Sequence, residues 1–363
     1  MSLVFLIIGL ILFVSLVVVH ELGHALVARR KGVVVDEFGI GFPPRITGRK
    51  LKNGTLLSLN WLPLGGFVRL KGEHDAATGP GTYGGASLWS KTQILLAGVV
   101  VNWITAALIF TILALTGLPQ LLPDQFTVPS DTTYPRHEVL AAALVKGAPA
   151  DKAGMKEDDQ LISIAGEAVT SADELTHLTA AHAGQTVPVV VTRDGQTKTL
   201  TLTLNKQHSD TEGYAGIQPG EEILRRSTWS APIVGVGLTV QFTGATFDGL
   251  GQTIVHLFKR EFQQAGQNVA GPVGIFTILQ KSSQIGLTPV LFLIGIISLT
   301  LAVMNILPIP ALDGGRLFVT ILFRIMRRPL TKEREESIQT VGFLALLALI
   351  VLITVVDVRR ILG

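Results

Sequence analysis

The sequence predicts a polytopic α-helical membrane protein with about four transmembrane helices, a β-hairpin on the cytoplasmic side and an inserted α+β domain. Of the 363 residues, 48% are hydrophobic and only 16% are charged, whereas a soluble domain carries roughly 25% charged residues. A bilayer is crossed by roughly 17–25 apolar residues, and four stretches long enough to cross contain no charged side chain. They are residues 1–19, 94–122, 284–312 and 340–356.

The first span covers about residues 3–28, and basic clusters at the span ends predict its orientation. It lacks the basic start and the cleavage site of a signal peptide. Arg29, Arg30 and Lys31 follow it, and five more Lys and Arg residues between 324 and 334 precede the last span. Because cytoplasmic loops collect Lys and Arg, we expect a multi-pass protein of the plasma membrane whose N-terminus and insert are extracytoplasmic.

Strand and turn signals between the first two spans predict the β-hairpin. Apolar runs at residues 56–61 and 67–70 flank Pro63-Leu64-Gly65-Gly66, and two such runs around a Pro/Gly turn are typical of a hairpin. The other spans are expected at about residues 89–117, 288–307 and 340–357.

Residues 119–230 form a polar insert with fifteen acidic and nine basic residues. Residues 187–191 and 197–204 flank Arg193-Asp194-Gly195, which predicts a second hairpin. Ser171, followed three residues later by Glu174, has the spacing of a capping box and predicts a helix start. The insert is therefore expected to be a small α+β domain with its core at about residues 138–204.

The chain is expected to have three parts: a first membrane half at 1–118, the extracytoplasmic domain at 119–226, and a second membrane half at 227–363. Residues 230–259 are mildly apolar and rich in glycine. They predict a helix at the membrane edge and not a full crossing.

The sequence His20-Glu21-Leu22-Gly23-His24 carries the strongest chemical signal. Residues four apart lie on one face of a helix, so both imidazoles can bind one Zn²⁺ while Glu21 takes a proton from bound water. Charged groups at membrane depth cost roughly 2.5–3.5 kcal/mol each on insertion scales, and a metal offsets this cost. The alternative is a helix that ends at the interface with solvated side chains.

A catalytic zinc site takes three protein ligands and keeps one position open. The chain has no cysteine, so the third ligand has to be His, Asp or Glu. In the sequence NILPIPALDGG at 305–315, two prolines break the helix, and such a break within a membrane has to be surrounded by protein or a cavity. From spacing alone, Asp313 is equally well explained as a ligand or as the cap of the next helix.

Together these motifs resemble the site-2 protease family of intramembrane zinc metalloproteases, in the bacterial branch that includes the regulator of sigma-E protease. The residues that carry the resemblance are His20-Glu21-x-x-His24, Asn305-x-x-Pro308-x-Pro310-x-Leu312-Asp313-Gly314, Gly98-x-x-x-Asn102, the hairpin sequence at 63–68 and Gly271–Ile275. The resemblance implies that His20, His24 and Asp313 hold Zn²⁺ and that Glu21 is the catalytic base.

Two asparagines in these motifs have more than one possible role. Asn102 can hydrogen-bond the substrate backbone or the oxyanion, or it can hold two helices together. Asn305 can bind substrate in the same way or fix the unwound loop that follows it. The resemblance favours the substrate or oxyanion role for Asn102.

The insert resembles a single PDZ domain of the bacterial protease type, in Ala148–Met155 and Asp159–Gly166. Asp158 and Ala165 depart from the Gly and Asn usual at those positions. PDZ domains bind extended peptides by adding a strand to a sheet edge. The resemblance therefore implies that this domain binds a peptide, such as the end of a substrate trimmed by an upstream protease, or acts as a size filter.

The implied activity is hydrolysis of peptide bonds within or near transmembrane segments. Single-pass membrane proteins, such as anti-sigma factors or remnant signal peptides, are the expected substrates, with membrane lipid around the enzyme and no nucleic acid among its partners. We expect the hairpin residues Leu64, Gly65, Gly66 and Phe67 to hold the unwound substrate as an added strand, in a site open toward the cytoplasm. Two alternatives stay open: a membrane-bound PDZ scaffold without catalysis, and a membrane metalloprotease that cuts soluble loops.

Overall fold

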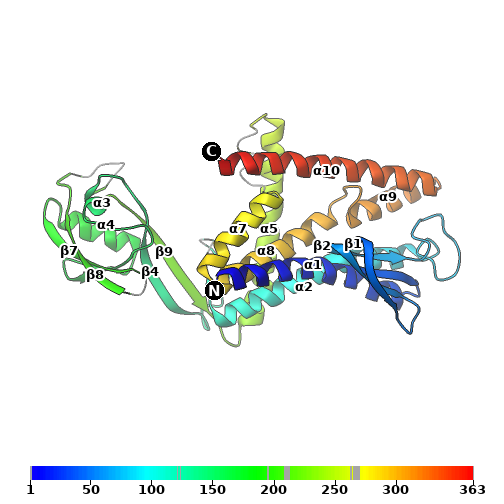
Figure 1. Ribbon diagram of the computed structural model, residues 1–363, viewed down its shortest axis with the longest axis horizontal. Coiled ribbons are helices and arrows are strands. Elements are labelled where there is room, and N and C mark those ends of the chain that lie inside the picture. The colour runs from blue at the N-terminus through cyan, green and yellow to red at the C-terminus, as the bar shows by residue number, and fades with distance from the viewer. Residues whose placement is uncertain are drawn as a thin grey trace. The chain divides into compact units, whose positions relative to one another are not determined.

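The computed structural model describes residues 2–120, 122, 124–193, 196–207, 213–261, 264 and 270–362, except for the side chains of residues 64, 135–137, 222, 257, 361 and 362. The chain divides into two compact units (Figure 1). One unit consists of Met1–Leu113 and Ala231–Gly363, and the other of Ala114–Ser230. The insert therefore forms one compact unit, and the segments before and after it together form the other.

The long helices of the first unit form where the sequence is free of charge. Among the described residues, four helices are long and apolar enough to cross a membrane, which confirms the four predicted spans. They are α1 (Ser2–Arg30), α2 (Leu88–Thr116), α8 (Leu287–Ile306) and α10 (Lys332–Leu362). Helix α10 begins before the predicted span, because its charged first turns continue the same helix.

Shorter or less apolar helices pack around α8. They are α5 (Ala231–Phe258), α7 (Pro272–Ile285) and α9 (Asp313–Ile325). Helix α5 confirms the helix predicted at 230–259. Phe110 of α2, Phe242 of α5 and Phe292 of α8 pack with ring centroids 5.6–5.7 Å apart. Helix α8 also contacts α1 and α7, so it is held from several sides.

The hairpin consists of β1 (Val35–Lys50) and β2 (Leu56–Leu70), which pair antiparallel. The predicted pairing of 56–61 with 67–70 is wrong. Residues 37–40 of β1 lie between these runs, with partners at 56–59 and at 66–69. The Pro/Gly sequence at 63–66 is therefore part of β2, and the chain turns at 51–55. The sequence hides β1 because acidic residues and glycines interrupt its apolar pattern.

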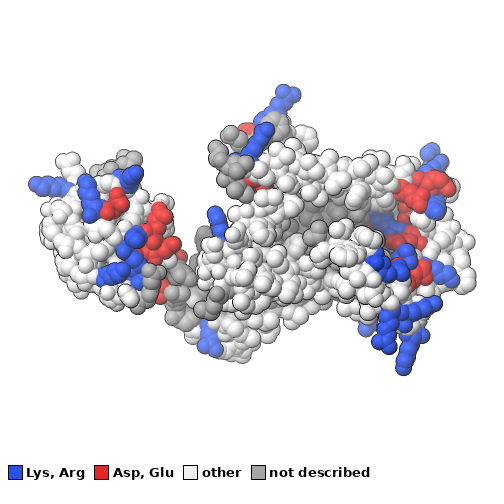
Figure 2. Space-filling view, in the orientation of Figure 1, with Lys and Arg blue, Asp and Glu red and all other residues white. Residues whose placement is uncertain are grey.

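Charged side chains of the first unit are unevenly distributed. On the face seen in Figure 2, they gather beside β1, β2 and the start of α10, and again near the ends of α5 and α10, whereas the surface over the middle of the helices is almost free of charge. Exposed apolar side chains on these helices include Leu108 of α2 and Leu352 of α10. An uncharged band of this kind is the surface that contacts lipid hydrocarbon.

The second unit is built around a seven-stranded sheet of order β3-β9-β4-β5-β7-β8, with β6 paired to β5. Its core includes Leu161, Ile164, Val189 and Leu202. The elements are β3 (Leu118–Pro119), β4 (Thr133–Leu144), α3 (Pro149–Lys152), β5 (Gln160–Ile164), β6 (Glu167–Ala168), α4 (Ala172–Ala181), β7 (Thr186–Arg193), β8 (Gln196–Thr203) and β9 (Ile217–Arg226). The sheet thus extends beyond the predicted core at both ends.

Both local predictions for this unit are confirmed. Strands β7 and β8 pair antiparallel from Thr186 with Thr203 to Arg193 with Gln196; the predicted turn residues Asp194 and Gly195 lie outside the described residues. Ser171 begins α4, since its hydroxyl accepts the Glu174 amide at 3.1 Å. The Glu174 carboxylate accepts the amide of Thr170, one residue before the position that a capping box uses.

A buried ion pair holds the second unit together. The Asp159 carboxylate accepts two hydrogen bonds of 2.6 Å from the Arg193 guanidinium and one of 2.9 Å from the Lys156 amide. Burial alone would raise the pKa of Asp159, but these hydrogen bonds hold it below its usual range. A carboxyl with a lowered pKa stabilises the fold above its unfolded pKa of about 3.9. This contribution is lost as the pH falls through the lower folded pKa.

We therefore expect Asp159→Asn to destabilise the second unit by about 1.5–3 kcal/mol at neutral pH, because it leaves Arg193 without its charged acceptor. Hydrogen exchange of β5 and β7 amides in the full chain measures the change. The difference in the free energy of unfolding between the variant and the parent should be constant near pH 7 and shrink below about pH 4. A difference that grew on acidification would contradict the assigned pKa direction.

Candidate metal centre

Helix α1 places two imidazoles and a carboxylate at one end of the bundle. His20 and His24 lie on one face, one turn apart, and both are buried. Their rings meet edge to face with centroids 4.8 Å apart. Gly23 lets α1 approach α2 on this face, since a Cβ there would lie 2.9 Å from the Ala97 carbonyl oxygen. The solvated-end alternative for these histidines is therefore wrong.

Asp313 joins the two histidines from the other half of the sequence. Its Oδ2 lies 3.1 Å from His20 Nε2 and 3.2 Å from His24 Nε2, and the two Nε2 atoms are 3.1 Å apart. These residues are the group of His, Asp and Glu that could hold a metal ion in the part of the chain that the structure describes.

This donor set fits a zinc ion better than it fits hydrogen bonds alone. If both ring N–H groups donated to Asp313, the two N–H groups would face each other at 3.1 Å. If only one of the two Nε2 atoms carried a proton, at least one of the three contacts among Asp313 Oδ2 and the two Nε2 atoms would have no proton to share. Ligand atoms of a tetrahedral zinc site with bonds of about 2.0–2.1 Å lie about 3.3–3.4 Å apart. The observed separations are close to this value, so a single cation can bind all three atoms.

The break between α8 and α9 directs Asp313 toward the histidines. Leu312 is the N-cap of α9, Asp313 is the first helical residue, and the Asp313 carboxylate contacts His20 and His24. The chain folds tightly here: a Cβ on Gly314 would lie 2.3 Å from the Ile306 oxygen, and one on Gly315 would lie 1.9 Å from the Ile309 oxygen. The alternative in which Asp313 caps the next helix is therefore wrong.

Helix α2 contacts both histidines from behind. His24 Nδ1 lies 2.7 Å from the Ile94 carbonyl oxygen, and Asn102 Nδ2 lies 3.2 Å from His20 Nδ1. Gly98 leaves room for the rings, because a Cβ there would lie 2.5–2.6 Å from atoms of His20 and His24. The Ile94 contact involves a backbone atom, so no residue type in the sequence could have revealed it.

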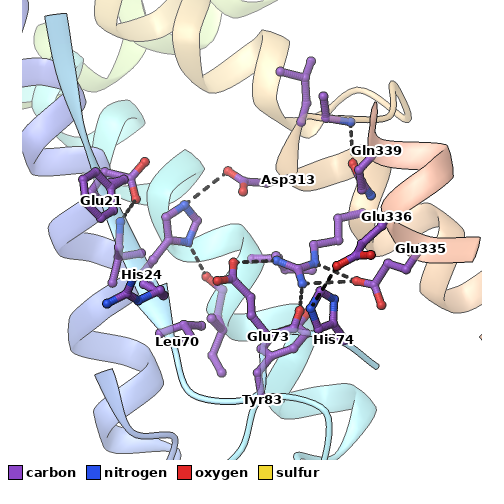
Figure 3. Close-up of a pocket in the computed structure, with 18 of the residues that line it drawn as sticks. Glu21, His24, Leu70, Glu73, His74, Tyr83, Asp313, Glu335, Glu336 and Gln339 are labelled. Atoms are coloured by element: carbon purple, nitrogen blue, oxygen red, sulfur yellow. Dashed lines mark hydrogen bonds and ion pairs between the residues drawn. The ribbon is translucent and has the colours of Figure 1, made fainter. Parts of the chain in front are cut away.

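Glu21 faces a cavity of about 830 Å³ beside the three side chains. Its Oε2 accepts the Val68 amide of β2 at 3.1 Å. Figure 3 shows Glu21 and Asp313 on either side of His24. The cavity is lined by Glu21, His24, Phe67, Val68, Asp313 and Arg316, among others.

A charged cluster forms the far end of this cavity (Figure 3). Arg316, one turn after Asp313 on α9, donates to Glu73 at 2.9 Å and to Glu335 at 3.1 Å. Its guanidinium stacks over the ring of Tyr83, 4.8 Å from the centroid. Burial raises the pKa of Tyr83 above its usual range, so the ring stays neutral. These contacts tie α9 and α10 to the loop after β2.

The other predicted site residues, Asn305 and the hairpin residues 64–67, do not belong to the group of His20, His24 and Asp313. Asn305 donates to the Leu301 carbonyl at 3.0 Å, a bond inside α8 and not to the loop that follows it. Gly66 lies close to α1, where a Cβ would be 3.9 Å from Glu21 Cγ. Phe67 lines the cavity, and Gly65 has a positive φ of 90°. Leu64 belongs to β2 by its backbone, and its side chain lies outside the described atoms.

Two histidines four residues apart with a glutamate between them are how many metalloproteases place zinc beside a general base. Here the helix that carries them is long and apolar enough to cross a membrane. The fold and the site thus define a membrane metalloprotease. More narrowly, the chain belongs to peptidase family M50, whose model matches residues 8–349.

Relatives match along nearly the whole chain. A protein of Clostridium perfringens, named as a candidate zinc metalloprotease, is 29% identical over 357 residues, which cover 98% of either chain. The regulator of sigma-W protease RasP of Bacillus subtilis is 26% identical, and the zinc metalloprotease RasP of Geobacillus kaustophilus is 25% identical. Each of these two matches covers 97% of both chains. The chain is thus a zinc metalloprotease of this family.

Proposed function

We propose that this enzyme is an intramembrane endopeptidase that hydrolyses peptide bonds within or near the transmembrane segments of membrane proteins. The observation that carries the proposal is the position of the site within α1. His20 lies ten residues before the end of this helix, about 15 Å at a rise of 1.5 Å per residue. Since the hydrocarbon core is about 30 Å thick, a substrate bond has to enter the membrane to reach the site.

In this proposal His20, His24 and Asp313 hold the zinc ion and Glu21 is the catalytic base. When bound, zinc supplies Lewis acidity that polarises a carbonyl and lowers the pKa of water. Glu21 accepts the proton of the attacking water and gives it to the leaving amine. The Val68 amide holds the Glu21 carboxylate toward the cavity.

The cavity opens toward the cytoplasm in the orientation that we propose. Arg29 and Arg30 end α1, and the basic residues between α9 and α10 lie in the same unit. Lys and Arg collect on the cytoplasmic side, so the N-terminus of α1 and the second unit are extracytoplasmic. Water then reaches Glu21 from the charged end of the cavity.

Single-pass membrane proteins are the proposed substrates, in the branch of the bacterial regulator of sigma-E protease. RasP of Bacillus subtilis is named a regulator of sigma-W protease, which supports anti-sigma factors as one substrate class, beside remnant signal peptides. The second unit is proposed to be a PDZ domain that binds a trimmed substrate end. Strand β8 is the last strand of its sheet and offers an edge to an added peptide.

Mapping of the cleaved bond tests the proposal. The purified enzyme is incubated with a single-pass substrate that has a soluble loop on each side, and the products are identified by mass spectrometry. Cuts within or next to the apolar span are expected. Cuts confined to the loops would contradict the proposal and favour the alternative of a loop-cutting metalloprotease.

Strand β2 supplies the proposed substrate clamp. Phe67 lines the cavity, and the Val68 amide points out of the hairpin toward Glu21. An unwound substrate added along this edge would present alternate residues to the hairpin. Because the chain has no cysteine, Phe67→Cys introduces a single thiol next to the site.

We expect this thiol, in an inactive Glu21→Gln enzyme, to form disulfides with every second position of a cysteine-scanned substrate. Gel analysis under non-reducing conditions measures the pattern. Lys52→Cys, in the exposed turn of the same hairpin, is the matched control and should give little cross-linking. A period of three to four positions would mean that the substrate stays helical and that the clamp is wrong.

A further inference from the structure

Asn102 lies against the Nδ1 edge of the His20 ring, whereas Asp313 and His24 lie at its Nε2 atom. The side chain is fully buried and does not line the cavity. Its Nδ2 lies 3.2 Å from His20 Nδ1, while its Oδ1 is buried without a hydrogen-bond partner among the described residues. The backbone oxygen of Asn102 is already paired, because it accepts the Ser298 hydroxyl at 2.8 Å.

Metal binding through Nε2 would make Nδ1 of His20 a hydrogen-bond donor. A neutral imidazole has one proton, and a ring that binds a cation through Nε2 carries it on Nδ1. That N–H then has to donate to an acceptor, as the second nitrogen of metal-binding histidines almost always does. The oxygen and the NH2 group of an amide are nearly the same in shape, and a half-turn about the last side-chain bond exchanges them.

We propose that Asn102 is a positioning residue for the metal, which accepts the Nδ1–H of His20 through its amide oxygen when Nε2 binds the ion. The half-turn brings the oxygen to the Nδ1–H of His20 and moves the NH2 group to the place where the oxygen has no partner, and the new hydrogen bond fixes the plane of the His20 ring. This inference rests on the ligand role proposed above for His20. It assigns Asn102 to the metal and not to the substrate or the oxyanion.

The partner of the other histidine supports this assignment. His24 Nδ1 lies 2.7 Å from the Ile94 carbonyl oxygen, so each ring has one acceptor on α2. Gly98 lies between Ile94 and Asn102, four residues from each, on the same face of the helix. An amide suits the deeper position because it accepts a hydrogen bond without adding a charge at membrane depth.

The zinc affinity of the purified full chain tests the proposal without recourse to cleavage. Competition with a chelator gives the dissociation constant for Asn102→Leu, which keeps the size of the side chain but has no acceptor. Loss of such a partner typically weakens metal binding 10–100-fold, and we expect a change of that order. Asn102→Asp retains an acceptor and should bind zinc more tightly than Asn102→Leu.

Ser298→Ala is the matched control, because it removes the hydrogen bond to the Asn102 backbone and leaves the amide in place. We expect its zinc affinity to be unchanged. Equal affinity in the parent and Asn102→Leu would overturn the proposal, as would an Asn102→Asp variant as weak as Asn102→Leu or a Ser298→Ala variant equally weakened. The unfolding temperature of the metal-free variants shows whether each is folded.

A measurement on the parent protein keeps the proposal testable if Asn102→Leu does not fold. Nitrogen NMR of histidine-labelled, zinc-loaded protein is expected to show His20 protonated at Nδ1 and its proton protected from exchange with water. An unprotonated Nδ1 would overturn the proposal. Loss of zinc binding in His20→Ala with no response to any change at Asn102 would leave the ligand role of His20 intact, so the two failures are distinguishable.

Discussion

Glu21→Gln should lower the rate of peptide-bond cleavage by about 10²–10⁴-fold, the range that a general base contributes, while zinc stays bound. Glutamine keeps the size of the side chain and can still accept the Val68 amide. It cannot take a proton from water. Because Glu21 does not belong to the triangle of His20, His24 and Asp313, its loss leaves the three donor atoms in place.

Two measurements on one preparation check this result: the turnover of a single-pass substrate and the zinc content by atomic absorption. Glu157→Gln, an exposed acid in the second unit, is the control for a change of charge and should cleave as the parent does. A Glu21→Gln enzyme with normal turnover would mean that another group is the base. A variant that lost both zinc and activity would instead place Glu21 among the ligands.

The membrane helices could be predicted from the sequence because a single local property defines them. A stretch such as 94–122 contains no charge, and no other part of the chain is needed to recognise it. The pairing within the hairpin could not be predicted in this way. Residues 37–40 insert between two segments of β2, and such long-range pairing depends on register that apolar runs alone do not specify.

The same distinction between local patterns and long-range contacts applies to the candidate metal centre. His20, Glu21 and His24 are recognisable because four residues make one helical turn. Asp313 is 289 residues beyond His24, so spacing left its role open and the family resemblance was needed. The contacts from α2 and β2, through Ile94 and Val68, are made by backbone atoms. No side-chain pattern encodes those atoms, and only the fold brings them to the site.

Gly98→Ala is expected to have a large effect because it disturbs the two histidine rings directly. The added Cβ would lie 2.5 Å from His20 Cε1 and 2.6 Å from the Nε2 atoms of both His20 and His24. The rings would have to move away from α2, and with them the donor atoms that face Asp313. A displacement of about 1 Å at a reacting centre costs roughly 10²-fold in rate, and we expect at least that loss in cleavage together with weaker zinc binding.

Gly249→Ala provides the matched control, because a Cβ at that position of α5 has no neighbour within 4 Å. Replacing a helical glycine at an open position stabilises a protein by about 0.4–1 kcal/mol, so this variant should unfold at the same or a higher temperature and bind zinc as the parent does. Chelator competition and cleavage assays on the two alanine variants separate crowding at the rings from a general effect of losing a glycine. If Gly98→Ala bound zinc and cleaved substrate normally, α2 could not pack as closely on the histidines as the contacts of Gly98 require, and the donor triangle would need a different arrangement.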